Sequence, residues 1–327
     1  MKINGIRNSR LSKDYLKDCM SQHRLSLFII LFISLSCMTF GAQAAVVERR
    51  LRVAVLDFGE TETGRRAADR VAGALTPTRD ATATNKTSVI DREQARAAAR
   101  GNGYAGSLNL TLEDARTLGA AIGCDFFITG EAQTVRRSPS DRAAHYEAYA
   151  AIFIVSTRTG RLLKWERPST TAATPQQAES ALLVELESRA RTLYQAALHE
   201  AQEKEAGERA ARLAQADAEE VFEDLSGVDA MEQNDLRLPQ PYRRLRPPYP
   251  ETAARYEVEA TVDALVDIDR EGEVSRVEIT RWAGFGLDDA VVATVRQLHF
   301  RPAMREGTPQ PVRVLLRYNF RRPPKTK

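Results

Sequence analysis

Few residues in this chain are of the types that build redox or disulfide sites. The 327 residues include three cysteines, and Cys19 and Cys37 both lie in the N-terminal leader. The remainder of the chain holds only Cys124 and therefore cannot form an internal disulfide. We expect Cys124 to be a buried, unreactive thiol, because it precedes an apolar run and free cysteine is among the most buried residue types.

Histidines are equally scarce, and no enzyme or metal motif is complete. His145, His199 and His299 are scattered without the short separations of zinc ligands. No nucleophile elbow or Ser/His/Asp order appears. Gly101 to Gly106 fits G-x-G-x-x-G, but a helix-like Ala/Arg run precedes it where dinucleotide binding requires a strand. The sequence therefore predicts a protein that is not an enzyme, with no catalytic residue, metal or cofactor.

Charge of one sign is not in excess. The chain has 47 basic and 44 acidic residues, a net charge of +3, which gives no general case for nucleic-acid binding. Apolar residues make up 43% and charged residues 28%, as in ordinary globular proteins. The length allows two domains of common size with connections between them.

One long apolar run lies near the N-terminus, from Leu25 to Phe40. Basic residues precede it and small residues follow, which is the pattern of a secretory signal, with cleavage favoured after Ala44. The run is shorter than the ~20 residues that span a bilayer comfortably. An uncleaved single-pass inner-membrane anchor and a lipoprotein cysteine at Cys37 are the alternatives. Each predicts that the bulk of the chain is exported to the periplasm.

The leader is taken as residues 1–44, and residues 45–174 then read as an α/β periplasmic domain. β-branched and alternating runs predict strands, and helical spacing with acidic first turns predicts the helices between them. The expected strands are 51–58, 88–91, 125–131, 144–156 and 162–165, and the expected helices are 61–75, 92–100 and 111–122. This order predicts a three-layer-like α/β arrangement that ends in a hairpin.

Residues 175–238 are expected to form a helix and spacer. Pro175 opens the helix at a position where its missing N–H costs nothing. Its expected packing face is Leu182, Leu183, Leu186, Ala190, Leu193 and Ala197. From Gln202 to Glu220 the residues are almost all Ala, Glu, Lys, Arg and Gln, which favours a solvated, semi-rigid helix. An acidic joint follows from Asp224 to Asp235.

Residues 239–327 carry the clearest pattern in the chain. Apolar residues alternate strictly with polar ones from Glu257 to Asp269, which predicts one strand with one buried face. A turn at 269–272, a returning strand at 273–282, a helix at 287–298 and a last strand at 312–320 follow. The expected domain is an antiparallel three-stranded sheet with one packed helix, and the whole chain is α+β.

Five motifs in this last segment resemble the TonB C-terminal domain family. They are Pro248-Tyr249-Pro250 with Ala253-Ala254, Val266 to Gly272, Gly286 to Ala290, Phe300 to Ala303 with Gly307, and Tyr318-Asn319-Phe320. More weakly, the segments at 53–58, 89–93 and 124–131 resemble the α/β domain of curli-secretion lipoproteins and lipoprotein activators of peptidoglycan synthases. The second resemblance implies an assembly or partner-binding module.

The resemblance to the TonB family implies protein binding by β-augmentation, in which an extended segment of an outer-membrane transporter pairs with a sheet edge. It places the partner-binding surface on Arg246, Pro247, Pro248, Tyr249, Pro250, Val312, Arg313, Val314, Leu315, Leu316, Arg317 and Tyr318. Arg246 and Pro248 stand where the best-studied members carry glutamine. Arg313, Arg317 and Arg321 also fit an edge strand protected by charge.

Two functions follow from the resemblance. The first is binding to outer-membrane transporters, coupled through an inner-membrane motor complex to transmembrane transport. The second is a periplasmic scaffold or activator for envelope assembly, with no energy transduction. Energy-coupling members carry a histidine inside their N-terminal helix, whereas His23 precedes the apolar run here. An α/β domain and an Ala/Glu-rich helix stand in place of their Pro/Lys/Glu-rich arm.

Overall fold

The computed structural model describes residues 50–77, 87–140, 143–214, 222–227 and 236–322. The predicted signal, its cleavage site, the alternative anchor and Cys37 lie outside the described residues, as does part of the predicted spacer. Residues from Arg50 onward form one unit by their internal contacts. Among the described helices, none is both long and apolar enough to cross a membrane.

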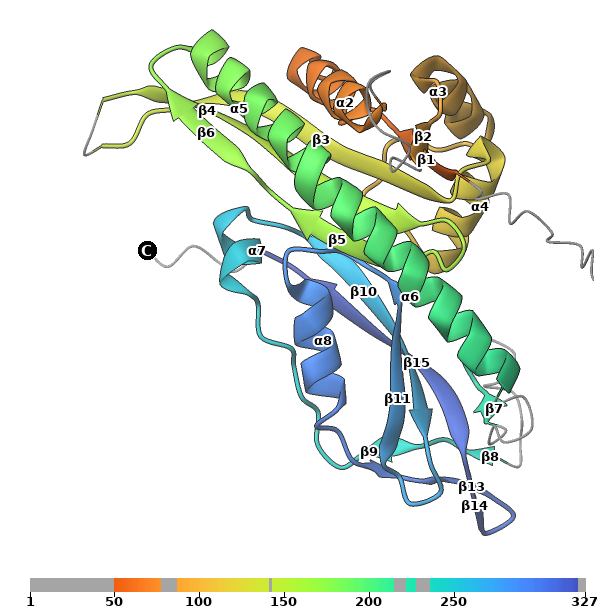
Figure 1. Cartoon of the computed structure of the whole chain (residues 1–327). Coiled ribbons are helices and arrows are strands. Elements are labelled where there is room, and N and C mark those ends of the chain that lie inside the picture. The colour runs from red at the N-terminus through yellow and green to blue at the C-terminus, as the bar shows by residue number, and fades with distance from the viewer. Residues whose placement is uncertain (1–49, 78–86, 141–142, 215–221, 228–235, 323–327) are drawn as a thin grey trace, which may run out of the picture. The chain divides into compact units, whose positions relative to one another are not determined.

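A mixed sheet organises the first part of the chain (Figure 1). Its strands are β1 (Leu51–Val55), β2 (Thr87–Val89), β3 (Phe126–Arg137), β4 (His145–Ser156), β5 (Leu162–Glu166) and β6 (Ser169–Ala172). The order is β2-β1-β3-β4-β5, and β6 pairs with β4 as well. β1 is parallel to β2 and β3, whereas β4 is antiparallel to β3, β5 and β6. The sequence predicted all of these strands except β6.

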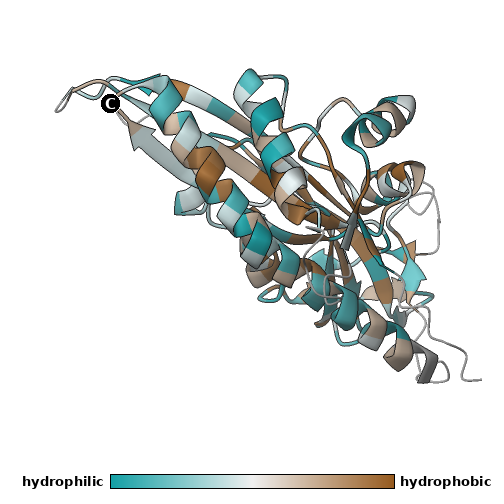
Figure 2. Cartoon of the chain, turned by 45° about the horizontal axis from the view of Figure 1, so that its top comes forward, coloured by the Kyte–Doolittle hydropathy of each residue, from teal (hydrophilic) through white to brown (hydrophobic). Residues whose placement is uncertain are grey.

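Helices cover both faces of this sheet. They are α2 (Glu62–Leu75), α3 (Arg92–Gly101), α4 (Leu112–Ile122) and α5 (Pro175–Arg189). Because successive strand residues point to opposite faces, Val53 and Val55 join a core with α2 and α5, while Ala54 joins a second core with α3 and α4. Figure 2 shows brown, apolar strands between helices that mix brown with teal. The expected three-layer arrangement is therefore confirmed.

The long helix packs on the sheet through a row of residues spaced four apart. The row is Ala178, Leu182, Leu186, Ala190, Tyr194 and Leu198, all buried. A four-residue repeat drifts around an α-helix by about 40° per step, because the α-helix has 3.6 residues per turn. A wider π-helical turn, η1 (Ala190–Tyr194), turns the row back toward the sheet before α6 (Gln195–Ala214) continues. The prediction that Leu193 is buried was wrong: it is 44% exposed, and Tyr194 takes its place.

The part of α6 that the composition predicts to be solvated is fastened to the first sheet. Glu205 accepts hydrogen bonds from the Ser156 hydroxyl and from Arg158 Nε, the latter at 2.8 Å. Ala201 is buried one turn earlier. From Gln202 to Ala211 the side chains are otherwise exposed, apart from half-buried Glu208. The helix is therefore solvated as predicted, but it is tied to the first sheet at Glu205.

A second sheet organises the C-terminal part, in the order β11-β10-β15-β7. Its strands are β7 (Glu223–Asp224), β10 (Ala260–Ile268), β11 (Val274–Arg281) and β15 (Val312–Phe320). β10 is antiparallel to both neighbours, and α8 (Leu287–Val295) packs its apolar side on one face of the sheet. The predicted three-stranded sheet with one helix is confirmed, and β7 adds a short parallel strand.

Short elements complete the C-terminal part. They are β8 (Leu236–Arg237), β9 (Gln240–Pro241), α7 (Glu251–Arg255), β12 (Phe300–Arg301), β13 (Ala303–Arg305) and β14 (Thr308–Gln310). β9 pairs with β12, and β13 pairs with both β14 and β8. The sequence predicted none of them, because pieces of two to five residues are too short to show a period.

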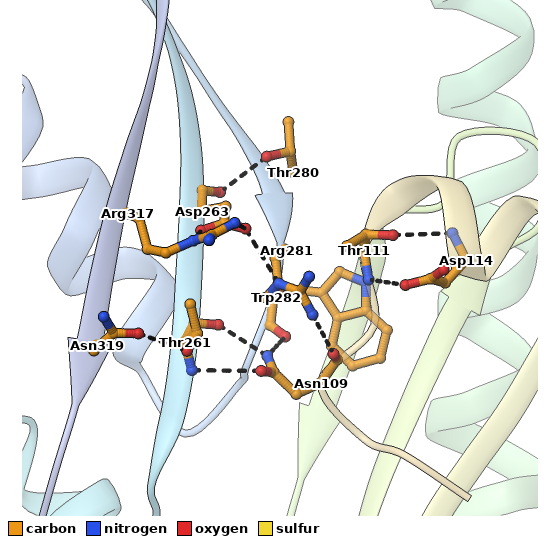
Figure 3. Close-up of polar contacts among 10 residues, drawn as sticks. All are labelled: Asn109, Thr111, Asp114, Thr261, Asp263, Thr280, Arg281, Trp282, Arg317 and Asn319. Carbon is orange, nitrogen blue, oxygen red and sulfur yellow. Dashed lines mark hydrogen bonds and ion pairs between the residues drawn. The ribbon is translucent and has the colours of Figure 1, made fainter. Parts of the chain in front are cut away.

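The α/β part and the C-terminal sheet contact one another directly (Figure 3). Trp282, which follows β11, is buried in the second core of the α/β part and stacks on Phe153 at 5.7 Å between ring centroids. The side-chain amide of Asn109 donates to the carbonyls of Thr261 at 2.9 Å and Trp282 at 2.6 Å. Arg161 forms an ion pair with Glu278 at 2.8 Å. These contacts join two parts that the sequence predicted to be separated by a spacer.

A stacked arginine forms a further contact between the two parts. The guanidinium of Arg167 lies 3.6 Å from the ring centres of both Tyr149 and Tyr256. Tyr149 belongs to β4, and Tyr256 follows α7 in the C-terminal part. The Arg167 side chain is only 6% exposed, so its attraction to the two rings is little screened by water. This contact holds the beginning of the C-terminal domain on the first sheet.

Candidate protein-binding edge of the C-terminal sheet

One long side of β15 carries no neighbouring strand over most of its length. β10 pairs with β15 from Val312 to Phe320, whereas on the other side β7 pairs only with Val312 and Arg313. The amide of Leu225 donates to the Arg313 carbonyl at 2.7 Å, so the backbone of Arg313 faces outward. Because this direction repeats every two residues, the outward groups beyond it belong to Leu315, Arg317 and Asn319. Within the described residues, no strand pairs with these three.

A groove of about 540 Å³ runs along this open edge. One wall is β15 itself, and the other is the segment 238–246, which is held by the β9–β12 pairing and by the Tyr242 amide donating to the His299 carbonyl at 2.9 Å. The apolar lining consists of Leu225, Leu238, Pro239, Pro241, Leu245, Leu298, Phe300, Val314, Leu315, Leu316 and Tyr318. The groove thus places apolar side chains beside an unpaired strand edge.

The charged residues that line the groove are all arginines. They are Arg243, Arg244, Arg246 and Arg317. In the described part of the chain, the first three form no ion pair and are exposed. A cluster of unpaired cations attracts acidic groups and raises their local concentration. The groove therefore favours a ligand with apolar side chains and negative charge.

The face of the sheet turned away from α8 is also covered, by ion pairs between β10 and β15. Asp263 and Arg317 lie directly opposite one another, and so do Asp267 and Arg313. Arg317 Nε lies 2.7 Å from Asp263, which Arg281 also contacts at 3.1 Å, and Arg313 Nε lies 2.5 Å from Asp267. The two carboxylates are only 4% and 3% exposed. The prediction of a single buried face was therefore too simple.

These pairs explain the arginines on the last strand. Arg313 and Arg317 hold β15 against β10, and Arg321 pairs with Glu259 at 3.6 Å, so they do not stand free along the edge. Burial of Asp263 opposes its ionisation, but hydrogen bonds from Arg317 and Arg281 outweigh burial and keep its pKa below the ordinary value. The carboxylate is therefore ionised at neutral pH and contributes to the sheet.

The structure brings together half of the residues that the resemblance implied. Those that line the groove are Arg246, Val314, Leu315, Leu316, Arg317 and Tyr318. Val312 is buried in the core, and Arg313 lies beside β7. Pro247 is half-buried and Pro248 is exposed, and neither lines the groove.

Tyr249 and Pro250 have structural surroundings. The Tyr249 hydroxyl donates to the Val258 carbonyl at 2.5 Å, and its ring lies 6.2 Å from that of Phe320. The carbonyl of Pro250 accepts the Ala254 amide at 2.9 Å, where α7 begins. These contacts position the end of β15 and the entry into the domain.

Several groove residues escaped the sequence analysis. The run Arg243-Arg244-Leu245-Arg246 is visible in the sequence as a basic cluster and was a usable signal. Leu225, Leu298 and Phe300 carry no such signal, because they reach the groove only when β7 and the segment after α8 fold against β15.

Comparison with known proteins agrees with the C-terminal assignment. Residues 246–321 match the family described as Gram-negative bacterial TonB protein C-terminal. The match confirms the resemblance for this segment and supports an envelope protein-interaction role. Among curated proteins, no sequence relative matches the chain.

Solved structures similar to the chain include a TonB domain and two further proteins. The TonB C-terminal domain of Pseudomonas aeruginosa is 18% identical, with a TM-score of 0.24. The match covers 30% of this chain and 94% of that domain. The LpoB C-terminal domain of Salmonella enterica is 13% identical over 41% and 90% of the two chains, with a TM-score of 0.25. Lipoprotein GNA1162 of Neisseria meningitidis is 15% identical over 42% and 93%, with a TM-score of 0.28.

Proposed function

We propose that this chain is a non-enzymatic periplasmic protein that captures an extended segment of a partner protein by strand addition to β15. The observation that carries the proposal is the open edge beside the groove: the outward backbone groups of Leu315, Arg317 and Asn319 lie unpaired next to an apolar lining. In strand addition, backbone hydrogen bonds supply affinity and pockets for alternate side chains supply specificity. Here the open edge offers the backbone groups for hydrogen bonds, and the groove offers the pockets for side chains.

The lining indicates the chemistry of the captured segment. Successive side chains of an added strand point to opposite faces, so every second side chain would enter the groove. The groove favours Leu, Val or Ile at those positions, because its lining is apolar. Acidic residues near either end of the segment would lie within reach of Arg243, Arg244 and Arg246, which have no ion-pair partner in the described part of the chain.

Two partner classes fit this chemistry, an outer-membrane transporter and an envelope assembly protein. The contacts of Trp282 and Asn109 with the α/β part favour the scaffold for envelope assembly, because they hold the C-terminal sheet on the α/β part instead of at the end of an extended arm. The mass of the mature N-terminus separates the two classes. A chain that begins at Ala45 excludes direct coupling to an inner-membrane motor, whereas a retained apolar run keeps the energy-coupled role open.

Strand addition is tested by proline substitution at an outward position. The N–H group of Leu315 faces away from β10, so Leu315→Pro removes an outward donor and leaves the β10 ladder in place. We expect loss of partner capture, measured by photocrosslinking from the last strand in intact cells. Leu315→Thr, which keeps the backbone donor, is the matched control. Full capture by a proline variant that circular dichroism shows to be folded would exclude strand addition.

A further inference from the structure

The chain already places a piece of itself on the candidate binding edge. β7 lies alongside the first residues of β15, in parallel (Figure 1). The Glu223 amide donates to the Pro311 carbonyl at 3.1 Å, and the Leu225 amide donates to the Arg313 carbonyl at 2.7 Å. β7 thus uses the same side of β15 that is open from Leu315 onward.

Side chains fasten this short strand at both ends. Glu223 forms an ion pair with Arg305 at 2.5 Å. Leu225 is 9% exposed, belongs to the C-terminal core cluster and lines the end of the groove. Between them, the Asp224 carboxylate accepts the Ser226 amide at 2.9 Å. Hydrogen bonds from the Ser226 side chain and amide, together with the nearby charge of Arg313, lower the Asp224 pKa. The segment combines acidic residues with one seated leucine, the same chemistry that the groove favours in a partner.

We propose that Glu223–Leu225 is a built-in competitor that occupies the first part of the partner-binding edge and must leave before a partner strand can pair along all of β15. The inference rests on the proposed function. An incoming strand that reaches Arg313 needs the carbonyl that Leu225 already uses, and its apolar side chains need the end of the groove where Leu225 sits. Because only molecules with β7 released can bind a partner along the whole edge, the apparent affinity equals the intrinsic affinity multiplied by the fraction with β7 released.

The competitor also connects capture to the rest of the chain. Leu225 belongs to the connection between α6 and the C-terminal domain, and Leu236–Arg237, further along the same connection, pairs with β13. Release of β7 therefore frees the connection at the point where it meets the binding edge. Partner binding and the attachment of this connection become mutually exclusive at Arg313.

The test uses two altered chains and a defined probe, a fluorescent synthetic peptide of eight alternating leucine and glutamate residues. Leu225→Ser removes the buried anchor and releases β7. Asp224→Cys with Arg313→Cys places two thiols at paired positions, so that oxidation locks β7 in place. The variant also carries Asp267→Asn, because the buried Asp267 carboxylate would otherwise lose its Arg313 partner. The reduced form of the same protein is the control for the lock, and the native Cys124 is buried. Peptide affinity is measured by anisotropy, and amide hydrogen exchange is followed at Leu225 and Arg317.

We expect Leu225→Ser to bind the peptide about tenfold more tightly than the unaltered chain, and the oxidised lock to bind more weakly than its reduced form. In the unaltered chain, the peptide should protect the Arg317 amide and expose the Leu225 amide. Suppose the peptide protects the Arg317 amide, but all forms bind it with equal affinity and the Leu225 amide stays protected. This result would overturn the competitor and leave strand addition intact. If no form protects Arg317, both proposals fail. Should Leu225→Ser not fold, the oxidised and reduced lock decide alone.

Discussion

The indole N–H of Trp282 donates a hydrogen bond of 3.1 Å to the carbonyl of Gly160, across 122 positions of sequence. Trp282 follows the last residue of β11, and Gly160 lies in the turn between β4 and β5. Gly160 has φ of +72°, and a Cβ there would lie 2.2 Å from the Leu112 carbonyl oxygen. Only glycine can therefore present this carbonyl to the indole, and the pair joins the two halves of the protein.

Trp282→Ala should uncouple the unfolding of the α/β part from that of the C-terminal part. Removing a fully buried tryptophan costs about 3–5 kcal/mol of unfolding free energy, and the loss should turn one urea transition into two. Trp165, 5.0 Å from Phe285, remains as the single fluorescent reporter. Trp282→Phe keeps most of the packing and loses the hydrogen bond, so it should cost about 1 kcal/mol for that bond in addition to a small packing loss. One unchanged transition in Trp282→Ala would mean that this contact does not couple the parts.

Asn109→Asp should destabilise the protein more than Asn109→Ala at neutral pH. The amide of Asn109 donates to two carbonyls, and a carboxylate in its place would repel both. Alanine only leaves the carbonyls unpaired, at about 1–3 kcal/mol. The aspartate variant should regain stability on acidification, because a protonated carboxyl can donate again. Thermal unfolding at pH 7 and pH 4.5 compares the two variants, and equal losses at both pH values would count against the assigned donor.

Arg281→Met should weaken the C-terminal sheet by about 1–3 kcal/mol, because buried Asp263 loses one of its two cationic partners. The pKa of Asp263 lies below its ordinary value of 3.8 in the folded protein. The stability that ionised Asp263 contributes to the folded protein is therefore present above pH 3.8 and is lost as the pH falls further through the folded pKa. A double-mutant cycle with Asp263→Asn measures the coupling energy. A value of zero would show that the pair is screened by water.

The pH dependence of stability that Asp288 contributes should be opposite to that of Asp263. Burial raises its pKa to about 6, and hydrogen bonds from the Ala283 and Gly284 amides only partly offset that effect. A group with a raised folded pKa contributes stability below its unfolded pKa, and the contribution is lost as pH rises toward 6. The stability of the unaltered chain relative to Asp288→Asn should fall by about 3 kcal/mol between pH 3.5 and 6.5. The carboxyl carbon of Asp288 should titrate near pH 6 by nuclear magnetic resonance, and a midpoint near 4 would contradict the assigned burial.

Elements with a long, regular period could be predicted from the amino-acid sequence. The alternation that starts at Glu257 predicted β10, and the motifs from Tyr249 to Phe320 predicted a TonB-type domain that the family match confirms. Alternating strands and amphipathic helices predicted the three layers of the α/β part. These features are local, because a strand or helix with one buried face shows that face as a repeat in the sequence.

Which surfaces meet could be seen only in the folded chain. A pattern marks Trp282 as apolar but does not say that its partner is Gly160, and a polar alternation does not show that Asp263 is buried under arginines from two other strands. The two-residue β7 has no period at all, and its place beside Arg313 follows from where the chain returns after α6. Long-range pairing depends on complementary surfaces from distant segments, and one sequence lists those surfaces without stating how they pair.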